Sequence, residues 1–294
     1  MIMENKTIKK KRTKIITLSV IGIALVLLIV WIAWGNNALE LNSYSIASNS
    51  LPKEFDGFRI AQVSDLHNAE MGKDNEKLIS MLADAEPDII VITGDMIDSR
   101  NTKVDVALNF AEQAVKIAPC YYVTGNHEAR VDEYSNLKDG LTELGVIVLE
   151  DAKTEIVCLG ESIVLVGVTD PSFETDYLFG DDETVMQSKL KELINEEDGY
   201  VVLLSHRPEL FATYVKNKVD MVFSGHAHGG QFRLPLVGGI VAPNQGVFPK
   251  YDAGVYTEDN TNMIVSRGVG NSIIPFRVNN RPEVILIELT TQGE

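Results

Sequence analysis

The five histidines of this 294-residue chain all lie in short motifs whose residue types can bind metal ions. The four motifs are Ser64-Asp65-Leu66-His67, Gly125-Asn126-His127-Glu128, Ser205-His206-Arg207-Pro208 and Gly225-His226-Ala227-His228. Imidazole nitrogens and carboxylate oxygens hold first-row divalent metals, and two such metals about 3.5 to 4 Å apart can grip both the attacking and the leaving oxygen of a phosphoryl displacement. The histidines therefore predict a site with two metal ions that acts on phosphate esters.

Three further side chains complete this candidate site. Asp65 stands two residues before His67, so both side chains can converge on one metal while the residue between them points into the core. Asp95 follows Gly94 at the end of an apolar run, and its two oxygens suit a bridge between two cations. Asn126 offers a neutral amide oxygen, which limits the charge around the second metal.

The first half of the chain alternates β-branched runs with helical patterns. Strands are predicted at residues 59–63, 89–93 and 121–124, and helices at residues 75–85, 104–117 and 137–144. Asp65, Asp95 and Asn126 follow successive strands at intervals of 30 and 31 residues. This spacing is close to one βαβ unit, so the three side chains are expected at the carboxyl edge of a largely parallel sheet.

The second half predicts a second sheet. Consecutive strands are expected at residues 155–159 and 163–168, then an acidic loop at 170–182 and a helix at 185–194. Strands at residues 201–205 and 221–224 would deliver His206 and His226, and strands at 263–266 and 284–289 would close the domain. Cys120 and Cys158 both lie in apolar runs and are expected to be buried, with a disulfide disfavoured.

The N-terminus predicts a membrane anchor. Residues 15–34 carry no charge and are long enough to span the hydrocarbon core, with Trp31 and Trp34 suited to its outer interface. Six basic residues precede this run and the next one is Lys53, so residues 1–14 are expected to be a cytoplasmic tail and the rest to lie outside. A cleaved signal peptide is the alternative, disfavoured by the length of the run and the absence of a clear cleavage site. Residues 35–50 are expected to be a short exit segment and residues 51–294 the catalytic domain.

The charge balance argues against nucleic acid as a partner. Beyond residue 34 the chain has 20 basic and 41 acidic residues, a formal charge of −21. Proteins bind nucleic acid largely through lysine and arginine side chains that neutralise its phosphates. A surface with about twice as many acidic as basic residues does not provide this neutralisation. The sequence points to a small-molecule or lipid phosphoester as the partner, and no protein partner can be inferred.

The motifs together resemble the five sequence blocks of the calcineurin-like metallophosphoesterase superfamily. The resemblance covers residues 58–289, and Gly229-Gly230-Gln231 with Val265-Ser266-Arg267-Gly268 further resembles its bacterial membrane-associated branch, some members of which act on UDP-diacylglucosamine or other phosphodiesters. It implies an α/β fold: a four-layer α/β/β/α sandwich with two mixed sheets and a dinuclear site at their shared edge, here preceded by one transmembrane helix. Carried over to this sequence, it implies one metal on Asp65, His67 and His228, a second on Asn126, His206 and His226, and Asp95 between them.

The resemblance also implies a mechanism. A hydroxide that bridges the metals would attack phosphorus, in a phosphodiester or pyrophosphate bond, and His127 would be the catalytic acid rather than a ligand. Asp98 is expected either to orient His127 or to be a solvated turn residue, and Glu128 is expected either to support the site from behind the ligands or to be solvated in the same way. Four arginines are weighed as phosphate contacts against ordinary ion pairs: Arg207, Arg233, Arg267 and Arg277.

Two alternatives remain open at the level of the sequence. One is a silent metal-binding or sensing module without turnover, which the intact ligand positions and His127 disfavour. The other is an enzyme restricted to a phospholipid or nucleotide-linked lipid of the bilayer, which the short tether permits. The expected cofactor is two divalent metal ions, Mn, Fe or Zn, because this ligand set accepts several metals.

Overall fold

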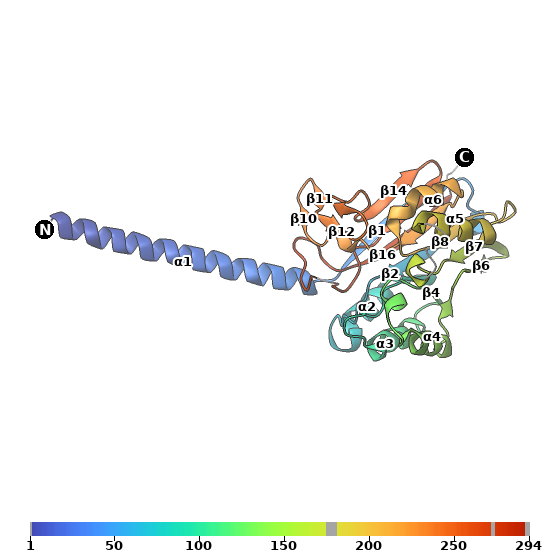
Figure 1. Cartoon of the computed structure of the whole chain (residues 1–294), viewed down its shortest axis with the longest axis horizontal. Coiled ribbons are helices and arrows are strands. Elements are labelled where there is room, and N and C mark those ends of the chain that lie inside the picture. Colours follow the sequence, from blue (N-terminus) through green and yellow to red (C-terminus); the bar gives the residue numbers. More distant parts are fainter. Residues whose placement is uncertain (1, 175–180, 272–273, 292–294) are drawn as a thin grey trace.

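The computed structural model describes residues 2–174, 181–271 and 274–291. A long helix extends away from a domain in which two β-sheets face each other and helices cover their outer sides (Figure 1). Within the described residues, one helix, Lys10–Asn37, is long and apolar enough to cross a membrane by length and composition, and an 18-residue stretch of it has a mean hydropathy of 3.0. It is part of α1, Ile2–Asn37.

The first sheet has six strands in the order β1-β16-β2-β3-β4-β5. Strands β2 to β5 run parallel, as the βαβ pattern predicts, while β16 is antiparallel to β2 and parallel to β1. The sheet is therefore mixed. Its strands are β1 Glu40–Ser48, β2 Arg59–Val63, β3 Ile89–Thr93, β4 Cys120–Val123, β5 Ile147–Val148 and β16 Glu283–Thr291.

The second sheet also has six strands, in the order β14-β15-β9-β8-β7-β6. Its centre is parallel, and the pairs at its two edges are antiparallel hairpins. The strands are β6 Ala152–Cys158, β7 Glu161–Gly167, β8 Val201–Leu204, β9 Met221–Ser224, β14 Gly254–Glu258 and β15 Thr261–Val265.

Three apolar clusters separate the layers. The central cluster fills the space between the sheets with side chains from both, among them Val91, Val202 and Ile285. A second cluster packs the first three domain helices on the outer face of the first sheet, and a third packs α5 and α6 on the second sheet. The four-layer sandwich is thus confirmed, with helices α2 Glu76–Ala85, α3 Val104–Ala114, α4 Tyr134–Glu143, α5 Asp182–Leu193 and α6 Phe211–Lys216.

Residues 35–50, expected to be only an exit segment, differ from that expectation. Glu40–Ser48 form strand β1, which pairs in parallel with β16 along its whole length. Alternate residues of β1, including Leu41 and Ser43, are exposed, whereas Ile46 is buried. The chain therefore passes from α1 directly into the edge of the first sheet.

Two other local expectations need correction. Cys120 is fully buried, but Cys158 is only half-buried because it ends the edge strand β6; both thiols are free. Helix α5 begins at Asp182, where the Asp181 side chain accepts a hydrogen bond from the Thr184 N–H, within the segment expected to be loop. Residues 175–180 of that acidic loop lie outside the described residues.

Two small hairpins precede β14. They are β10 Arg233–Leu234 with β11 Gly238–Gly239, and β12 Val241–Ala242 with β13 Gly246–Val247. They lie on the side of the domain from which α1 extends (Figure 1).

Candidate metal centre

The seven predicted ligands leave the ends of five strands. Asp65 and His67 follow β2, Asp95 follows β3 and Asn126 follows β4, all in the first sheet. The other three come from the second sheet, His206 after β8 and His226 and His228 after β9. Because these strand ends meet at one edge of the sandwich, ligands up to 163 residues apart in sequence are brought together.

A buried side chain links the two sheets at this edge, and two loops of the first sheet pack closely there. The buried Gln62 amide donates hydrogen bonds to the Thr93 hydroxyl at 2.9 Å and to the Ser224 carbonyl at 2.8 Å, one in each sheet. Gly94 has φ +85°, and a Cβ there would lie 2.5 Å from the Gly125 nitrogen. Glycine is therefore required for the loops after β3 and β4 to approach this closely.

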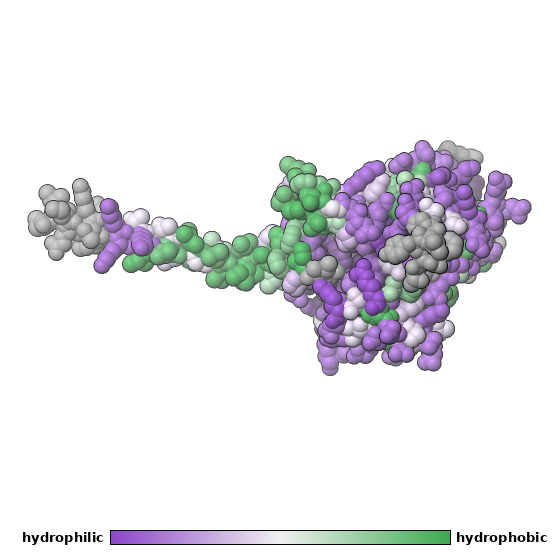
Figure 2. Space-filling view, viewed as in Figure 1, coloured by the Kyte–Doolittle hydropathy of each residue, from purple (hydrophilic) through white to green (hydrophobic). Residues whose placement is uncertain are grey.

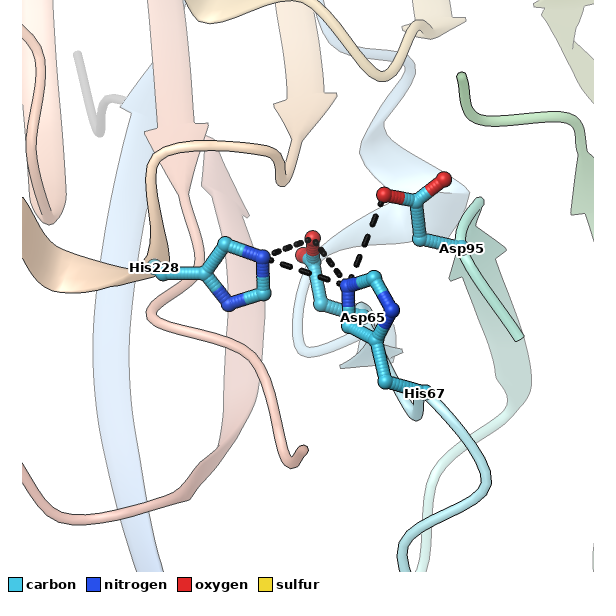
Figure 3. Close-up of side chains that lie close together, drawn as sticks. All are labelled: Asp65, His67, Asp95 and His228. Atoms are coloured by element: carbon cyan, nitrogen blue, oxygen red, sulfur yellow. Dashed lines mark hydrogen bonds and ion pairs between the residues drawn. The ribbon is translucent and has the colours of Figure 1, made fainter. Parts of the chain in front are cut away.

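The first cluster contains Asp65, His67, Asp95 and His228, whose candidate ligand atoms all lie within 4.8 Å of one another. The two Nε2 atoms of His67 and His228 are 3.2 Å apart, and His228 Nε2 lies 3.3 Å from Asp65 Oδ1. His67 Nε2 lies 3.5 Å from Asp95 Oδ2. Figure 3 shows the two rings and the two carboxylates pointing toward a common centre.

The second cluster shares Asp95 with the first. Asp95, His206 and His226 form another group of buried candidate ligands. His206 Nε2 lies 3.2 Å from Asp95 Oδ2 and 3.2 Å from His226 Nδ1. His206 also donates from Nδ1 to the Thr93 carbonyl at 2.7 Å, which leaves Nε2 free for a metal. One oxygen of Asp95 thus faces both clusters.

Asn126 tests whether the residues fit metal ions. Its side chain is buried, yet its Oδ1 atom has no hydrogen-bond partner among the described residues. A buried amide oxygen without a partner is costly, and coordination of a cation would satisfy it. The imidazole nitrogens that face each other at 3.2 Å and the convergent carboxylates also fit two cations.

The histidines of the site favour the ionised form of the Asp95 carboxylate. Burial raises the pKa of Asp95, but His206 and His67 outweigh burial and hold it well below its usual range. Burial lowers the pKa of His206, but Asp95 and Asp65 outweigh burial and raise it to about 10. Burial also lowers the pKa of His228 to about 3. Bound cations would take over the role of the proton on His206, since metal ligands must be deprotonated.

The ligands also share an unusual backbone conformation. Five of them adopt positive φ, a region that residues other than glycine rarely occupy. Local hydrogen bonds hold this geometry: the Asp65 N–H donates to the Gly94 carbonyl, and the His226 N–H donates to the Asp65 carboxylate. The five residues are Asp65, His67, Asp95, His226 and His228.

His127 lies beside the first cluster, with its ring 4.5 Å from that of His67 and perpendicular to it. Its Nδ1 accepts a hydrogen bond from the Ser99 N–H at 3.0 Å, which places the proton of the neutral ring on Nε2. Burial lowers the pKa of His127 to about 4. The Asp98 carboxylate is 3.7 Å from Nδ1, beyond hydrogen-bond distance, and bonds Arg100 instead. The sequence did not predict the hydrogen bond from Ser99 to His127, because its donor is a backbone N–H, which every residue except proline carries.

Glu128 lies behind the ligands, fully buried. Its carboxylate accepts hydrogen bonds from the N–H groups of Asp95 at 3.0 Å, Met96 at 2.8 Å and Gly125 at 2.8 Å. Burial and the charge of Asp95 raise its pKa to about 7. Glu128 therefore ties the loops after β3 and β4 together and takes the supporting one of the two positions left open for it.

The four arginines weighed as phosphate contacts all engage protein acceptors. Arg207 forms a buried bidentate pair with Asp170 and lies 3.4 Å from His226 Nε2. Arg233 pairs with Asp252. The other two are Arg267, which pairs with Glu283 and Glu40, and Arg277, which donates to backbone carbonyls.

Comparison with known proteins places the chain among phosphoesterases. The calcineurin-like phosphoesterase family model matches residues 58–230. An uncharacterized metallophosphoesterase of Bacillus subtilis, YkuE, is 29% identical over 258 residues, 85% of each chain. Phosphodiesterase YaeI of Escherichia coli is 28% identical over 250 residues, 79% of this chain and 82% of the relative.

Two other matches extend the comparison. A Danio rerio transmembrane protein with a metallophosphoesterase domain is 26% identical over 253 residues, 83% of this chain and 56% of that protein. The structure of TT1561 from Thermus thermophilus superposes with a TM-score of 0.51 at 14% identity, covering 72% of this chain and 90% of that one, and shares its fold. The chain belongs to the calcineurin-like phosphoesterase family, whose members are metal-dependent phosphoester hydrolases.

Proposed function

We propose that the protein is a membrane-anchored phosphodiesterase that works with two divalent metal ions and cleaves phosphodiester or pyrophosphate bonds. The observation that carries this proposal is the position of Asp95 Oδ2, 3.5 Å from Nε2 of His67 in one cluster and 3.2 Å from Nε2 of His206 in the other. A single carboxylate oxygen between two groups of imidazoles suits a pair of ions better than one ion. The name of the relative YaeI supports a diester as substrate.

The residues divide into two ligand sets. Asp65, His67 and His228 would hold the first ion, and Asn126, His206 and His226 the second, with Asp95 shared. When bound, the two ions supply activation of water and neutralisation of charge on the phosphate. The chain contributes rigid placement, because the ligands leave strand ends and their backbone is held by hydrogen bonds.

His127 would act at the leaving oxygen. In its neutral form, with Nδ1 accepting from the Ser99 N–H, the ring donates a hydrogen bond through Nε2. Full proton transfer to the leaving oxygen requires the ring to take a second proton from solvent at Nδ1. The Ser99 N–H must then turn away, and the Ser99 hydroxyl at 3.2 Å and the Asp98 carboxylate at 3.7 Å would be the nearest acceptors for the Nδ1–H. The imidazolium would give its Nε2 proton to the departing alkoxide, which leaves the other proton on Nδ1, and exchange with solvent would restore the Nε2–H form. Asp98 would thus position His127 while Nδ1 is protonated.

The location follows from the N-terminal helix. The uncharged run 15–34 would cross the membrane once, with the six preceding basic residues in the cytoplasm and the catalytic domain outside. The name of the Danio rerio relative, a transmembrane protein, supports membrane attachment.

Hydrolysis by the full chain tests the proposal. The detergent-solubilised protein is stripped of metal, reloaded with Mn²⁺, Fe²⁺ or Zn²⁺, and assayed on a bis-nitrophenyl diester and a nitrophenyl monoester. We expect diester cleavage with at least one metal, lost on removal of metal and in Asp95→Asn. Cleavage of the monoester alone would overturn the diester assignment, and no turnover despite two bound metals would favour a silent module.

A further inference from the structure

An exposed apolar rim surrounds the two small hairpins. The rim consists of large hydrophobic side chains that are exposed to solvent: Leu234, Leu236, Val237, Val247, Phe248 and Phe276. Leu236, at the tip of the β10–β11 hairpin, is fully exposed and Phe248 is 62% exposed. Residues 234–249 carry no charge, although 23% of the whole chain is charged. A contiguous apolar surface of this kind marks an interaction site.

The rim is continuous with the end of α1. The Arg233 N–H of β10 donates to the Val278 carbonyl, and the ring of Phe232 lies 5.6 Å from that of Phe276. Two residues of α1 contact the segment that contains Phe276 and Val278, residues 276–281. Asn36 exchanges two hydrogen bonds with the backbone of Arg277, and the Trp34 ring lies 5.1 Å from the guanidinium of Arg281.

The hairpins and the end of α1 lie on the same side of the domain (Figure 1). The hairpins lie at the end of the domain from which α1 leaves, and an apolar patch covers that end beside the apolar helix (Figures 1 and 2). If the uncharged run of α1 that ends at Trp34 spans a bilayer, the rim lies at the membrane surface.

The hairpins that carry most of the rim also border the metal centre. A pocket of about 260 Å³ is lined by Ala227, His228, Gln231, Val241, Ala242, Pro243 and Ile274. His228 belongs to the first ligand cluster, and Val241 and Ala242 form strand β12 within the hairpins. The pocket thus offers an apolar path from the hairpins to the candidate ligands.

We propose that the apolar rim docks into the outer surface of the same bilayer that α1 spans, so that the substrate is a phosphoester whose apolar chain enters the pocket beside His228. The bilayer is the occupant that fits the rim, because the rim is uncharged, includes the exposed tip of the β10–β11 hairpin and adjoins the helix end. The inference about substrate rests on the proposed function, whereas the docking itself rests on the surface alone.

Depth measurement tests the docking. Full-length protein is placed in phosphatidylcholine–phosphatidylglycerol nanodiscs with a spin label at Leu236→Cys or Phe248→Cys, in a Cys158→Ser background. Leu159→Cys is the matched control, because this leucine is 88% exposed and lies in the turn between β6 and β7, remote from α1 (Figure 1). We expect oxygen to relax the labels at positions 236 and 248 more than a water-soluble nickel chelate does, and the reverse at position 159. Labels at 236 and 248 that favour the chelate, or that neither quencher reaches, overturn the docking; the second result would instead indicate a protein contact.

Turnover tests the substrate class. The metal-loaded protein in nanodiscs is assayed on nitrophenyl hexadecyl phosphate and on nitrophenyl ethyl phosphate. In the triple variant Leu236→Ser/Val237→Ser/Phe248→Ser, the ratio of the two rates should fall about tenfold or more, since each serine removes apolar burial in lipid, while Leu159→Ser keeps the ratio. An unchanged ratio in the triple variant overturns the lipid assignment. No cleavage of either ester would instead fail the proposed function, and the depth result would still stand.

Discussion

At the scale of single residues, Asp95 is the side chain on which the two-metal account depends. Its Oδ2 atom faces an imidazole from each cluster, and its Oδ1 accepts a hydrogen bond from the backbone N–H of His127 at 2.8 Å. We predict that Asp95→Asn lowers the metal content from two ions per chain to one or none and abolishes diester cleavage, because an amide brings no charge to the shared position. Elemental analysis of the purified protein measures this change.

The exposed Asp84 on α2 provides a matched control for that substitution. Asp84→Asn should keep both ions and full activity. Two ions retained in Asp95→Asn would show that Asp95 is not a shared ligand.

His127 separates turnover from metal binding. Because His127 contacts Ser99 and lies outside both ligand clusters, we predict that His127→Gln keeps both metal ions while kcat for the diester falls by roughly 10²- to 10⁴-fold, the usual contribution of general acid catalysis. Asp98→Asn should cost less, because Asp98 bonds Arg100 and only approaches His127. Steady-state kinetics with metal analysis measures both variants, and loss of a metal ion from His127→Gln would make His127 a ligand.

At the scale of secondary-structure elements, Glu128 joins the loops after β3 and β4. It accepts backbone N–H groups from both loops while fully buried. We predict that Glu128→Gln lowers the free energy of unfolding of the metal-free protein by roughly 1 to 3 kcal/mol. The side-chain NH2 group of glutamine would face buried backbone N–H groups, which would lose their acceptor. Urea unfolding followed by near-ultraviolet circular dichroism measures this loss. The exposed Glu143→Gln on α4 should leave stability unchanged, and equal stability of the two variants would refute the role of Glu128.

The elements that position the site could be predicted because their sequence patterns are local. Strand β2 and strand β3 are short apolar runs followed by polar ligands, and the structure has them at the predicted residues. Strand β1 was missed because serine and asparagine interrupt its pattern and its partner, β16, lies about 240 residues away in sequence. Contacts that depend on tertiary placement, such as the Arg207–Asp170 pair and the Ser99 N–H on His127, have no local signal.

The hairpins also could not be predicted from local sequence. Glycine, proline and apolar residues in 231–256 fit either a substrate entrance or hairpins packed on the core. The structure has hairpins whose tips are exposed, which composition alone could not decide because it does not place the neighbouring 276–281 segment.

At the scale of the whole molecule, α1 determines where the catalytic domain works. We predict that a protease added to intact cells removes an epitope tag at the C-terminus but leaves one at the N-terminus, because the basic residues before the span remain inside. Immunoblotting of both tags measures the orientation, and cells made permeable to the protease should lose both tags. Protection of the C-terminal tag in intact cells would place the domain in the cytoplasm.

A metal titration of the full chain shows whether two bound ions act together. Metal-free protein receives increasing amounts of the activating metal while diester cleavage and bound metal are measured together. We expect little activity at one bound ion and saturation at two ions per chain, because Asp95 links two ligand sets. Full activity with a single bound ion, or activity that does not depend on metal, would contradict this expectation.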